Sequence, residues 1–131
     1  MPAATTAPTL VLTVTPVPEA VARVRRALVR GGLDADLEHT VSLLTSEVVT
    51  NSIQHGGAGG EIRVAATLET NFARVEVLDA GEGFDPDVRH SGSGFGLRLL
   101  DKLASRWGVE RARGTLVWFE VDRRRRRFGR D

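Results

Sequence analysis

Two different spacings of apolar residues divide this chain, and they restrict its fold more than any other feature of the sequence. In four segments every second residue is apolar, which is typical of strands with one buried face. In three others apolar residues recur every three or four positions, as in amphipathic helices. The strand-like segments are 9–15, 61–69, 73–77 and 115–122, and the helix-like segments are 18–30, 34–55 and 97–107.

Turn-forming residues set the boundaries of these segments. Pro18 suits the first position of a helix, and Gly32 ends that helix. Asp34 or Asp36 is expected to cap the second helix, and Gly114 separates the segment 115–122 from one further strand before it, which brings the expected strands to five. The resulting order is strand, helix, helix, strand, strand, helix, strand, strand. It predicts an α/β sandwich, with a mostly antiparallel mixed sheet of about five strands and three helices on one face.

Composition narrows the class of protein. The 131 residues include no cysteine, which excludes disulfides and thiolate sites. The N-terminus lacks the basic and apolar regions of a signal peptide, and no stretch has the length of an apolar membrane span. We therefore expect a cytoplasmic protein that does not enter a membrane. Its single domain should cover 9–122, between a flexible N-terminus at 1–8 and an arginine-rich C-terminal tail at 123–131.

Charge is concentrated in that tail. It holds six of the 18 basic and one of the 17 acidic residues, which leaves 12 basic and 16 acidic residues elsewhere. The domain therefore lacks the basic field expected of a nucleic-acid-binding protein, and no direct nucleic-acid contact is expected. The tail itself could touch nucleic acid or an acidic partner, although runs of like charge are more often solvated and disordered.

A first polar cluster lies on the second predicted helix. Glu47, Asn51 and His55 are spaced by four, which places their side chains in a row beside the apolar stripe. Taken alone, this row also fits the polar boundary of an amphipathic helix. His55, next to Gly56, fits a role at the helix end, where it can bond the last carbonyls.

A second cluster, Asp79-Ala-Gly-Glu-Gly83, directly follows a predicted strand. Glycines there allow a sharp turn and a close approach to a ligand, while a carboxylate can accept hydrogen bonds from an exocyclic amine. The same letters also fit an ordinary turn, so this cluster alone leaves both interpretations open.

A third cluster, Gly92-Ser-Gly-Phe-Gly96, opens the last predicted helix. Backbone amides in such a loop, with a helix N-terminus behind them, can bind phosphate oxygens. The pattern is not a P-loop, which ends in Gly-Lys-Ser/Thr. An isolated glycine loop of this kind is weak evidence for a phosphate site.

In this order, and with Gly114-Thr115 opening the last strand, the three clusters resemble the motifs of GHKL (histidine-kinase-like) ATPases over residues 9–122. The resemblance implies a Bergerat ATP-binding fold. In its short length and its motif Glu47-Val-Val-Thr-Asn51, the chain is most similar to anti-sigma factor serine/threonine kinases. The segment between Asp85 and Ser93 would then be a short ATP lid.

The resemblance also implies a role for each site residue. Glu47 would be the catalytic base, Asn51 the protein ligand of Mg²⁺, and Asp79 the acceptor of the adenine amine. In that family an arginine at the position of Arg23 meets the antagonist protein. The remaining residues of the implied ATP site are Gly81 and Gly83 beside the base, Gly92, Gly94, Gly96 and Leu97 around the phosphates, and Thr115 supporting Asp79 through water.

The function implied is a serine/threonine kinase that phosphorylates an anti-sigma factor antagonist and sequesters a sigma factor. Homodimerisation is a further implication of the resemblance. Two alternatives remain open: an ATP-dependent adaptor without phosphotransfer, and a catalytic fragment of a histidine kinase. Retention of both Glu47 and Asn51 favours an enzyme over an adaptor, because nucleotide binding alone does not need a carboxylate beside the γ-phosphate.

Overall fold

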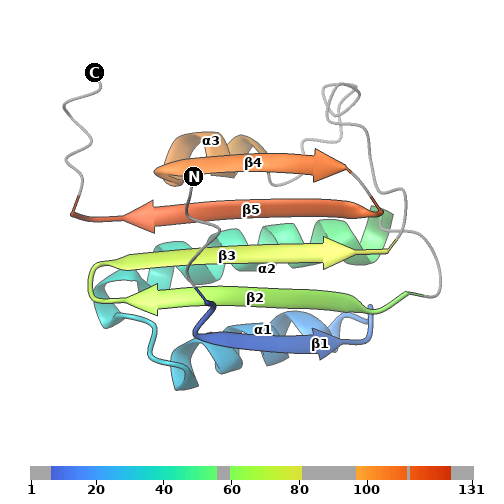
Figure 1. Ribbon diagram of the computed structural model, residues 1–131, viewed down its shortest axis with the longest axis horizontal. Helices are drawn as coiled ribbons and strands as arrows, with labels where there is room; N and C mark the ends of the chain where they lie inside the picture. The colour runs from blue at the N-terminus through green and yellow to red at the C-terminus, as the bar shows by residue number, and fades with distance from the viewer. Residues whose placement is uncertain (1–6, 56–59, 81–96, 112, 125–131) are drawn as a thin grey trace.

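The computed structural model describes residues 7–55, 60–80, 97–111 and 113–124, and it forms one sheet covered by one layer of helices (Figure 1). Its elements in chain order are β1 (Leu10–Val14), α1 (Glu19–Arg30), the 3-10 turn η2 (Ala35–Leu37), α2 (Glu38–His55), β2 (Ile62–Glu69), β3 (Phe72–Asp79), α3 (Leu97–Leu103), β4 (Arg106–Arg111) and β5 (Thr115–Asp122).

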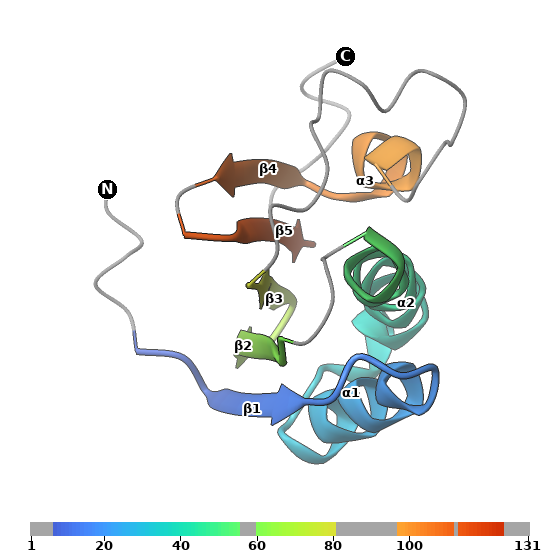
Figure 2. The ribbon, with the colours of Figure 1, turned by 90° about the vertical axis from the view of Figure 1, so that its right-hand side faces the viewer.

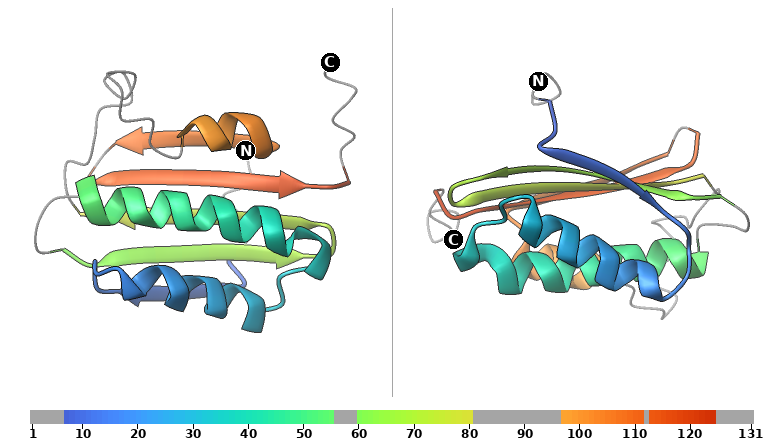
Figure 3. Two further views of the ribbon diagram at one scale, coloured as in Figure 1. Left: turned by 180° about the vertical axis from the view of Figure 1, so that it is seen from behind. Right: turned by 90° about the horizontal axis from the view of Figure 1, so that it is seen from below.

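The predicted α/β sandwich is confirmed. The five strands lie in the order β1-β2-β3-β5-β4, and every neighbouring pair is antiparallel. All three helices cover the same face of this sheet, with α2 between α1 and α3 (Figures 2 and 3). Two of the four pairs, β2–β3 and β4–β5, are joined by short turns, which makes them antiparallel hairpins. Over the other face of the sheet lies no helix of the described residues.

The core lies between the helices and the sheet, and it uses the predicted apolar stripes. Val24 and Leu28 of α1 and Val41 and Leu44 of α2 are completely buried. The facing strands contribute alternate residues, as a half-buried sheet requires. Burying one such side chain stabilises the fold by about 1.5–3 kcal/mol. The strand residues of this core are Val14, Ile62, Val64, Ala66, Leu68, Ala73, Val75, Val77, Val117, Phe119 and Val121.

The last helix is shorter than its apolar spacing predicts. We expected helix over 97–107, but α3 ends at Leu103 and β4 begins at Arg106. The Ser105 amide donates a hydrogen bond of 2.7 Å to the Glu120 carbonyl, so the chain already pairs with β5 at this point. Trp107 packs against the core from the strand, and its indole nitrogen donates to Asp101 at 2.9 Å.

Trp118 lies on the uncovered face of the sheet and not in the core, although a large aromatic residue on a strand is expected to be a core residue. Its neighbours Val117 and Phe119 are buried, and strand alternation turns the indole to the other side. The Arg74 guanidinium lies 4.3 Å from the ring centroid and is bonded to Glu120 at 2.8 Å. This partial cover leaves Trp118 half-buried without a core around it.

The arginine-rich tail is described only at its first two residues. Arg123 pairs with Asp36 at 3.1 Å. Arg124 pairs with Asp122 at 2.9 Å, and its guanidinium lies 4.7 Å from the Phe72 ring centroid. Residues 125–131 lie outside the described part of the chain, so any binding role of the tail stays a prediction.

Asp34 joins the loop between α1 and α2 to the β2–β3 hairpin. As predicted for one of the two candidate caps, its carboxylate accepts from the Asp36 amide at 2.9 Å. It also accepts from the Asn71 amide at 2.8 Å. Asn71 is in the left-handed region, with φ of 62°, and its carbonyl accepts from Arg123. The hydrogen bonds from Asn71 and then Asp36 lower the pKa of Asp34 from its ordinary value of 3.8.

Replacing Asp34 with Asn should lower the melting temperature, because one acceptor oxygen is lost between two amides. A lowered pKa means that folding favours the ionised carboxylate. Its contribution is therefore complete well above pH 3.8 and is lost as pH falls below that value. We expect thermal unfolding at several pH values to show the wild-type advantage shrinking on acidification. Asp36→Asn, which breaks only an exposed ion pair, should change stability little. A constant advantage of wild type over Asp34→Asn down to low pH would contradict this account.

Thr45 of α2 is completely buried, and its hydroxyl has no hydrogen-bond partner among the described residues. A buried hydroxyl without a partner costs about 1–3 kcal/mol. Thr45→Val keeps the side-chain shape and removes this cost, so denaturant unfolding should show a gain of about 1 kcal/mol. Thr45→Ser keeps the hydroxyl and removes a methyl group, so it should be destabilising. A Thr45→Val variant no more stable than wild type would show that the hydroxyl is satisfied.

Candidate nucleotide-binding site

One end of the sheet brings the predicted site residues together. Strand register places five residues side by side across all five strands at this end: Val14, Ile62, Asp79, Thr115 and Arg111. Because β1 leads directly into α1, and α2 leads into β2, the start of α1 and the end of α2 lie at the same end (Figure 3). Segments far apart in sequence therefore meet here.

Asp79 and Thr115 form the buried polar centre of this end. Asp79 is the last residue of β3, Thr115 is the first of β5, and they are direct cross-strand partners. Their exposed fractions are 5% and 0%. Polar groups buried this deeply are usually hydrogen-bonded. The two side chains lie on the face of the sheet covered by helices, next to the core.

Gly114 makes this pairing possible. Its φ of 129° is strained for any residue with a side chain. A Cβ atom at this position would also collide with the Asp79 carbonyl oxygen and lie 3.3 Å from the Ala80 Cα. Glycine thus allows the chain that enters β5 to pass close to the end of β3, where Asp79 is located.

Asn51 lies one turn before the end of α2 that leads into β2, and Glu47 lies one turn further from that end. They are one helical turn apart, and the core residues Leu44 and Val48 lie on the neighbouring stripe. Asn51 is 6% exposed, whereas Glu47 is only half-buried. The amide is therefore largely shielded from solvent, and the carboxylate retains access to solvent and to an incoming group.

The other predicted site residues are described in part. Leu97, at the start of α3, is buried. Arg23 is exposed in the first half of α1, the half that begins at this end of the sheet. The five site glycines lie outside the described residues, so their contacts with base and phosphates stay predictions. These are Gly81, Gly83, Gly92, Gly94 and Gly96; the side chain of His55 is likewise not described.

Two hollows among the described residues lie away from this end of the sheet. With volumes of about 380 and 520 Å³, they lie between α1 and α2 and share Arg25, Glu38 and Ser42. None of their lining residues is a predicted site residue. Buried polar side chains indicate the candidate site instead, and the motifs single out Asp79 from the other buried carboxylates, Glu120 and Asp122, which pair with arginines.

The donors and acceptors at this end fit an adenine nucleotide with its magnesium ion. The Asp79 carboxylate can accept from an exocyclic amine, and the Thr115 hydroxyl can donate or accept beside it. Asn51 offers one fixed amide oxygen, which suits a cation that keeps most of its waters and takes its other ligands from phosphate. The residues present therefore match the group that the motifs predict.

Arg111 shares this end of the sheet and was not singled out from the sequence. Only the pairing of β4 with β5 reveals that it is the neighbour of Thr115. A weak signal existed in the strand alternation of Trp107, Val109 and Arg111, where an arginine follows two apolar residues on the same face. It could not be used, because Trp107 was assigned to the preceding helix.

Comparison with known proteins gives three findings. A family model described as a histidine kinase-like ATPase domain matches residues 10–121. An anti-sigma F factor from Clostridium acetobutylicum is 35% identical, over 73% of this chain and 78% of that protein. The NMR structure of the histidine kinase domain of the E. coli osmosensor EnvZ has a TM-score of 0.49 and 15% identity, covering 89% of this chain and 90% of that one. This last likeness is too distant to support an argument.

In the described part of the chain, no helix is long and apolar enough to cross a bilayer.

Gly114→Ala should destabilise the protein through both backbone strain and collision with Asp79. Strain at such a position costs about 1–3 kcal/mol. Gly32→Ala is the matched control, because Gly32 also has a positive φ, of 109°, but has no atom within 4 Å of an added Cβ. Denaturant unfolding should therefore show a larger loss for Gly114→Ala than for Gly32→Ala. Equal losses would mean that the close approach to Asp79 is not a constraint.

Proposed function

Because the chain belongs to the family of histidine kinase-like ATPase domains, we propose that it is an anti-sigma factor serine/threonine kinase. In this proposal it transfers phosphate from ATP to a serine or threonine of an antagonist protein, and in another state it sequesters a sigma factor. The similarity to an anti-sigma F factor supports the partner class. The observation that carries the proposal is the buried Asp79–Thr115 pair beside Asn51 and Glu47.

Nucleotide binding rests on Asp79. Its carboxylate accepts a hydrogen bond from the adenine amine, and Thr115 supports it from the neighbouring strand. The low exposure of both residues raises the cost of leaving either one unpaired, which favours a base that presents an amine over one that presents a carbonyl. This pair therefore provides selection for adenine.

Phosphoryl transfer rests on Glu47. The substrate hydroxyl oxygen forms a bond to the γ-phosphorus while the bond to the bridging oxygen breaks and ADP leaves. The hydroxyl proton passes to the Glu47 carboxylate, which is accessible because the residue is only half-buried. Most of the remaining acceleration comes from positioning and from neutralising charge on the phosphates.

Asn51 would hold the magnesium ion, which neutralises phosphate charge when bound. The burial of Asn51 keeps its amide from rotating away from the ion. It lies one turn beyond Glu47 on α2, so one rigid helix sets the distance between the metal ligand and the base. The α2 helix is thus the catalytic element of the proposal.

The antagonist would approach from the start of α1. Arg23 is exposed there, at the end of the sheet where the site lies. A partner contacting Arg23 can thus present its hydroxyl to a γ-phosphate held above the ends of the strands. Homodimerisation and a cytoplasmic location stay expectations from the resemblance to the kinase family.

The test uses purified protein, Mg²⁺ and γ-labelled ATP with a panel of small antagonist domains from the same genome. Wild type should place acid-stable label on one of them. Glu47→Ala should bind ATP normally but lose at least about 100-fold in transfer rate. Asp79→Asn should weaken ATP binding by about tenfold. The Asn amide has one acceptor oxygen where the carboxylate has two, and its NH2 group is a donor that cannot bond to the adenine amine.

The controls separate the alternatives. ATP binding without label on any partner would favour the non-catalytic adaptor. Acid-labile label would instead indicate a histidine kinase fragment. Loss of ATP binding in Glu47→Ala would contradict the role given to that carboxylate.

A further inference from the structure

We propose that Arg111 contacts the nucleoside part of the bound nucleotide, with its guanidinium lying against the adenine. The inference rests on the proposed function, because it takes ATP as the ligand. It adds a residue of β4, the edge strand, to a site otherwise formed by the central strands and α2. It also assigns the contact to the base and not to the phosphates.

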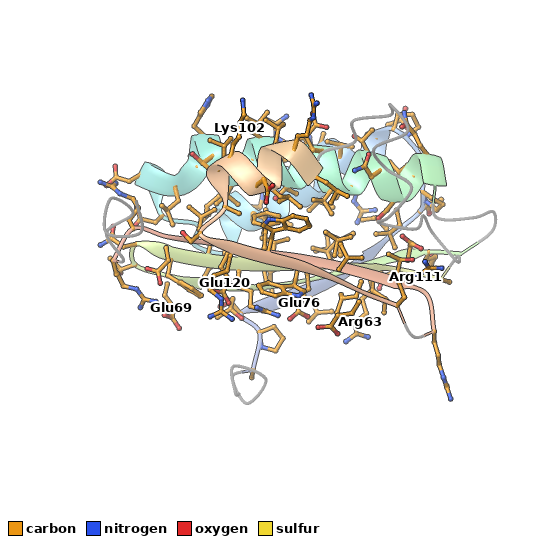
Figure 4. The ribbon with its side chains drawn as sticks, turned by 90° about the horizontal axis from the view of Figure 1, so that it is seen from above. Arg63, Glu69, Glu76, Lys102, Arg111 and Glu120 are labelled. Atoms are coloured by element: carbon orange, nitrogen blue, oxygen red, sulfur yellow. The ribbon has the colours of Figure 1, made fainter. Side chains whose placement is uncertain are left out.

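The position of Arg111 follows from strand alternation and register. Trp107 and Val109 of β4 pack against the core, so Arg111, two residues further, faces the same helix-covered side. Arg111 pairs with Thr115, and Thr115 pairs with Asp79. Figure 4 shows Arg111 at the end of the sheet on the helix side, whereas Arg63 lies on the other side.

The distance suits a contact with the base. Neighbouring strands are about 4.8 Å apart, so the Arg111 Cα lies about 10 Å from the Asp79 Cα, across one intervening strand. In the proposed pose, an adenine whose amine meets Asp79 extends from that carboxylate toward β4. An arginine side chain is long enough to reach from β4 onto the face of such a ring. The guanidinium would then cover the base while the carboxylate holds its amine.

The chemistry of the side chain agrees with this placement. Guanidinium is planar, weakly hydrated and stacks readily on aromatic faces. Arg111 is exposed, whereas Asp79 and Thr115 at the same end of the sheet are buried. The guanidinium can therefore cover a ligand while part of it stays in solvent, which avoids the free-energy cost of burying its charge completely. On this face of β4 the two preceding residues are apolar, and the change to arginine occurs where the strand reaches the site.

The experiment compares wild type, Arg111→Gln and Arg111→Lys, with Arg63→Gln as the matched control. Arg63 is an exposed arginine at the same end of the sheet, on the opposite face, so its replacement removes the same charge. Affinities for ATP are measured by calorimetry, and those for adenosine by ligand-detected NMR. Adenosine has no phosphate, so it reports contacts with the nucleoside alone.

We expect Arg111→Gln to lower the affinities for ATP and for adenosine by the same factor, about fivefold. Arg111→Lys should bind both ligands as weakly as Arg111→Gln, because an ammonium group keeps the charge but cannot stack on the base as a planar guanidinium can. Arg63→Gln should stay within twofold of wild type for both ligands. Circular dichroism and melting curves check that each variant is folded.

Three results would overturn the inference. A loss for ATP alone, with adenosine unaffected, would assign Arg111 to the phosphates. Unchanged affinities in Arg111→Gln would remove it from the site while leaving the proposed function intact. If wild type binds neither ligand, the proposed function fails first, and the contact fails with it.

Discussion

The structure depends on the antiparallel pairing of β3 with β5. This pairing places the last residue of one strand, Asp79, directly beside the first residue of the other, Thr115. Both side chains point to the covered face, and the core beneath them excludes water. Gly114 is required at the crossing because any side chain would collide with the Asp79 carbonyl. A single register thus creates a buried acceptor pair at an open end of the sheet, and a one-residue slip would turn both groups to the uncovered face.

The helices add further polar residues to the candidate site. The connections from β1 to α1 and from α2 to β2 are short, so the start of α1 and the end of α2 share one end of the sheet with Asp79. The apolar stripe of α2 fixes its rotation against the sheet, and Glu47 and Asn51 take their positions from that packing. The core packing of α2 therefore serves both stability and the candidate site, since it also sets the orientation of Glu47 and Asn51. The opposite end of the sheet has a structural role instead, with Asp34 joining the interhelical loop to the hairpin.

The uncovered face of the sheet shows that residue type alone does not predict which side chains are buried. Trp118 and Phe119 are consecutive aromatic residues on one strand, yet only Phe119 is completely buried. Arg74 and Glu120 cover part of the indole with an ion pair of 2.8 Å. Gly108 allows the ring to lie close to β4, where a Cβ would approach its nitrogen to 2.8 Å. Large apolar residues alone therefore do not identify the core; their phase along the strand does.

The sequence by itself determined the element types and order, the apolar stripes, the Asp34 cap and the three polar clusters, because all of these are local patterns of period two or four. It misplaced the end of α3, since apolar spacing in the sequence fits both a continued helix and the first strand residues, and only the Ser105 hydrogen bond to β5 decides between them. Tertiary structure alone decided that Asp79 and Thr115 are neighbours and that Arg111 stands beside them. Strand register depends on contacts between residues far apart in the chain, and no local spacing encodes it.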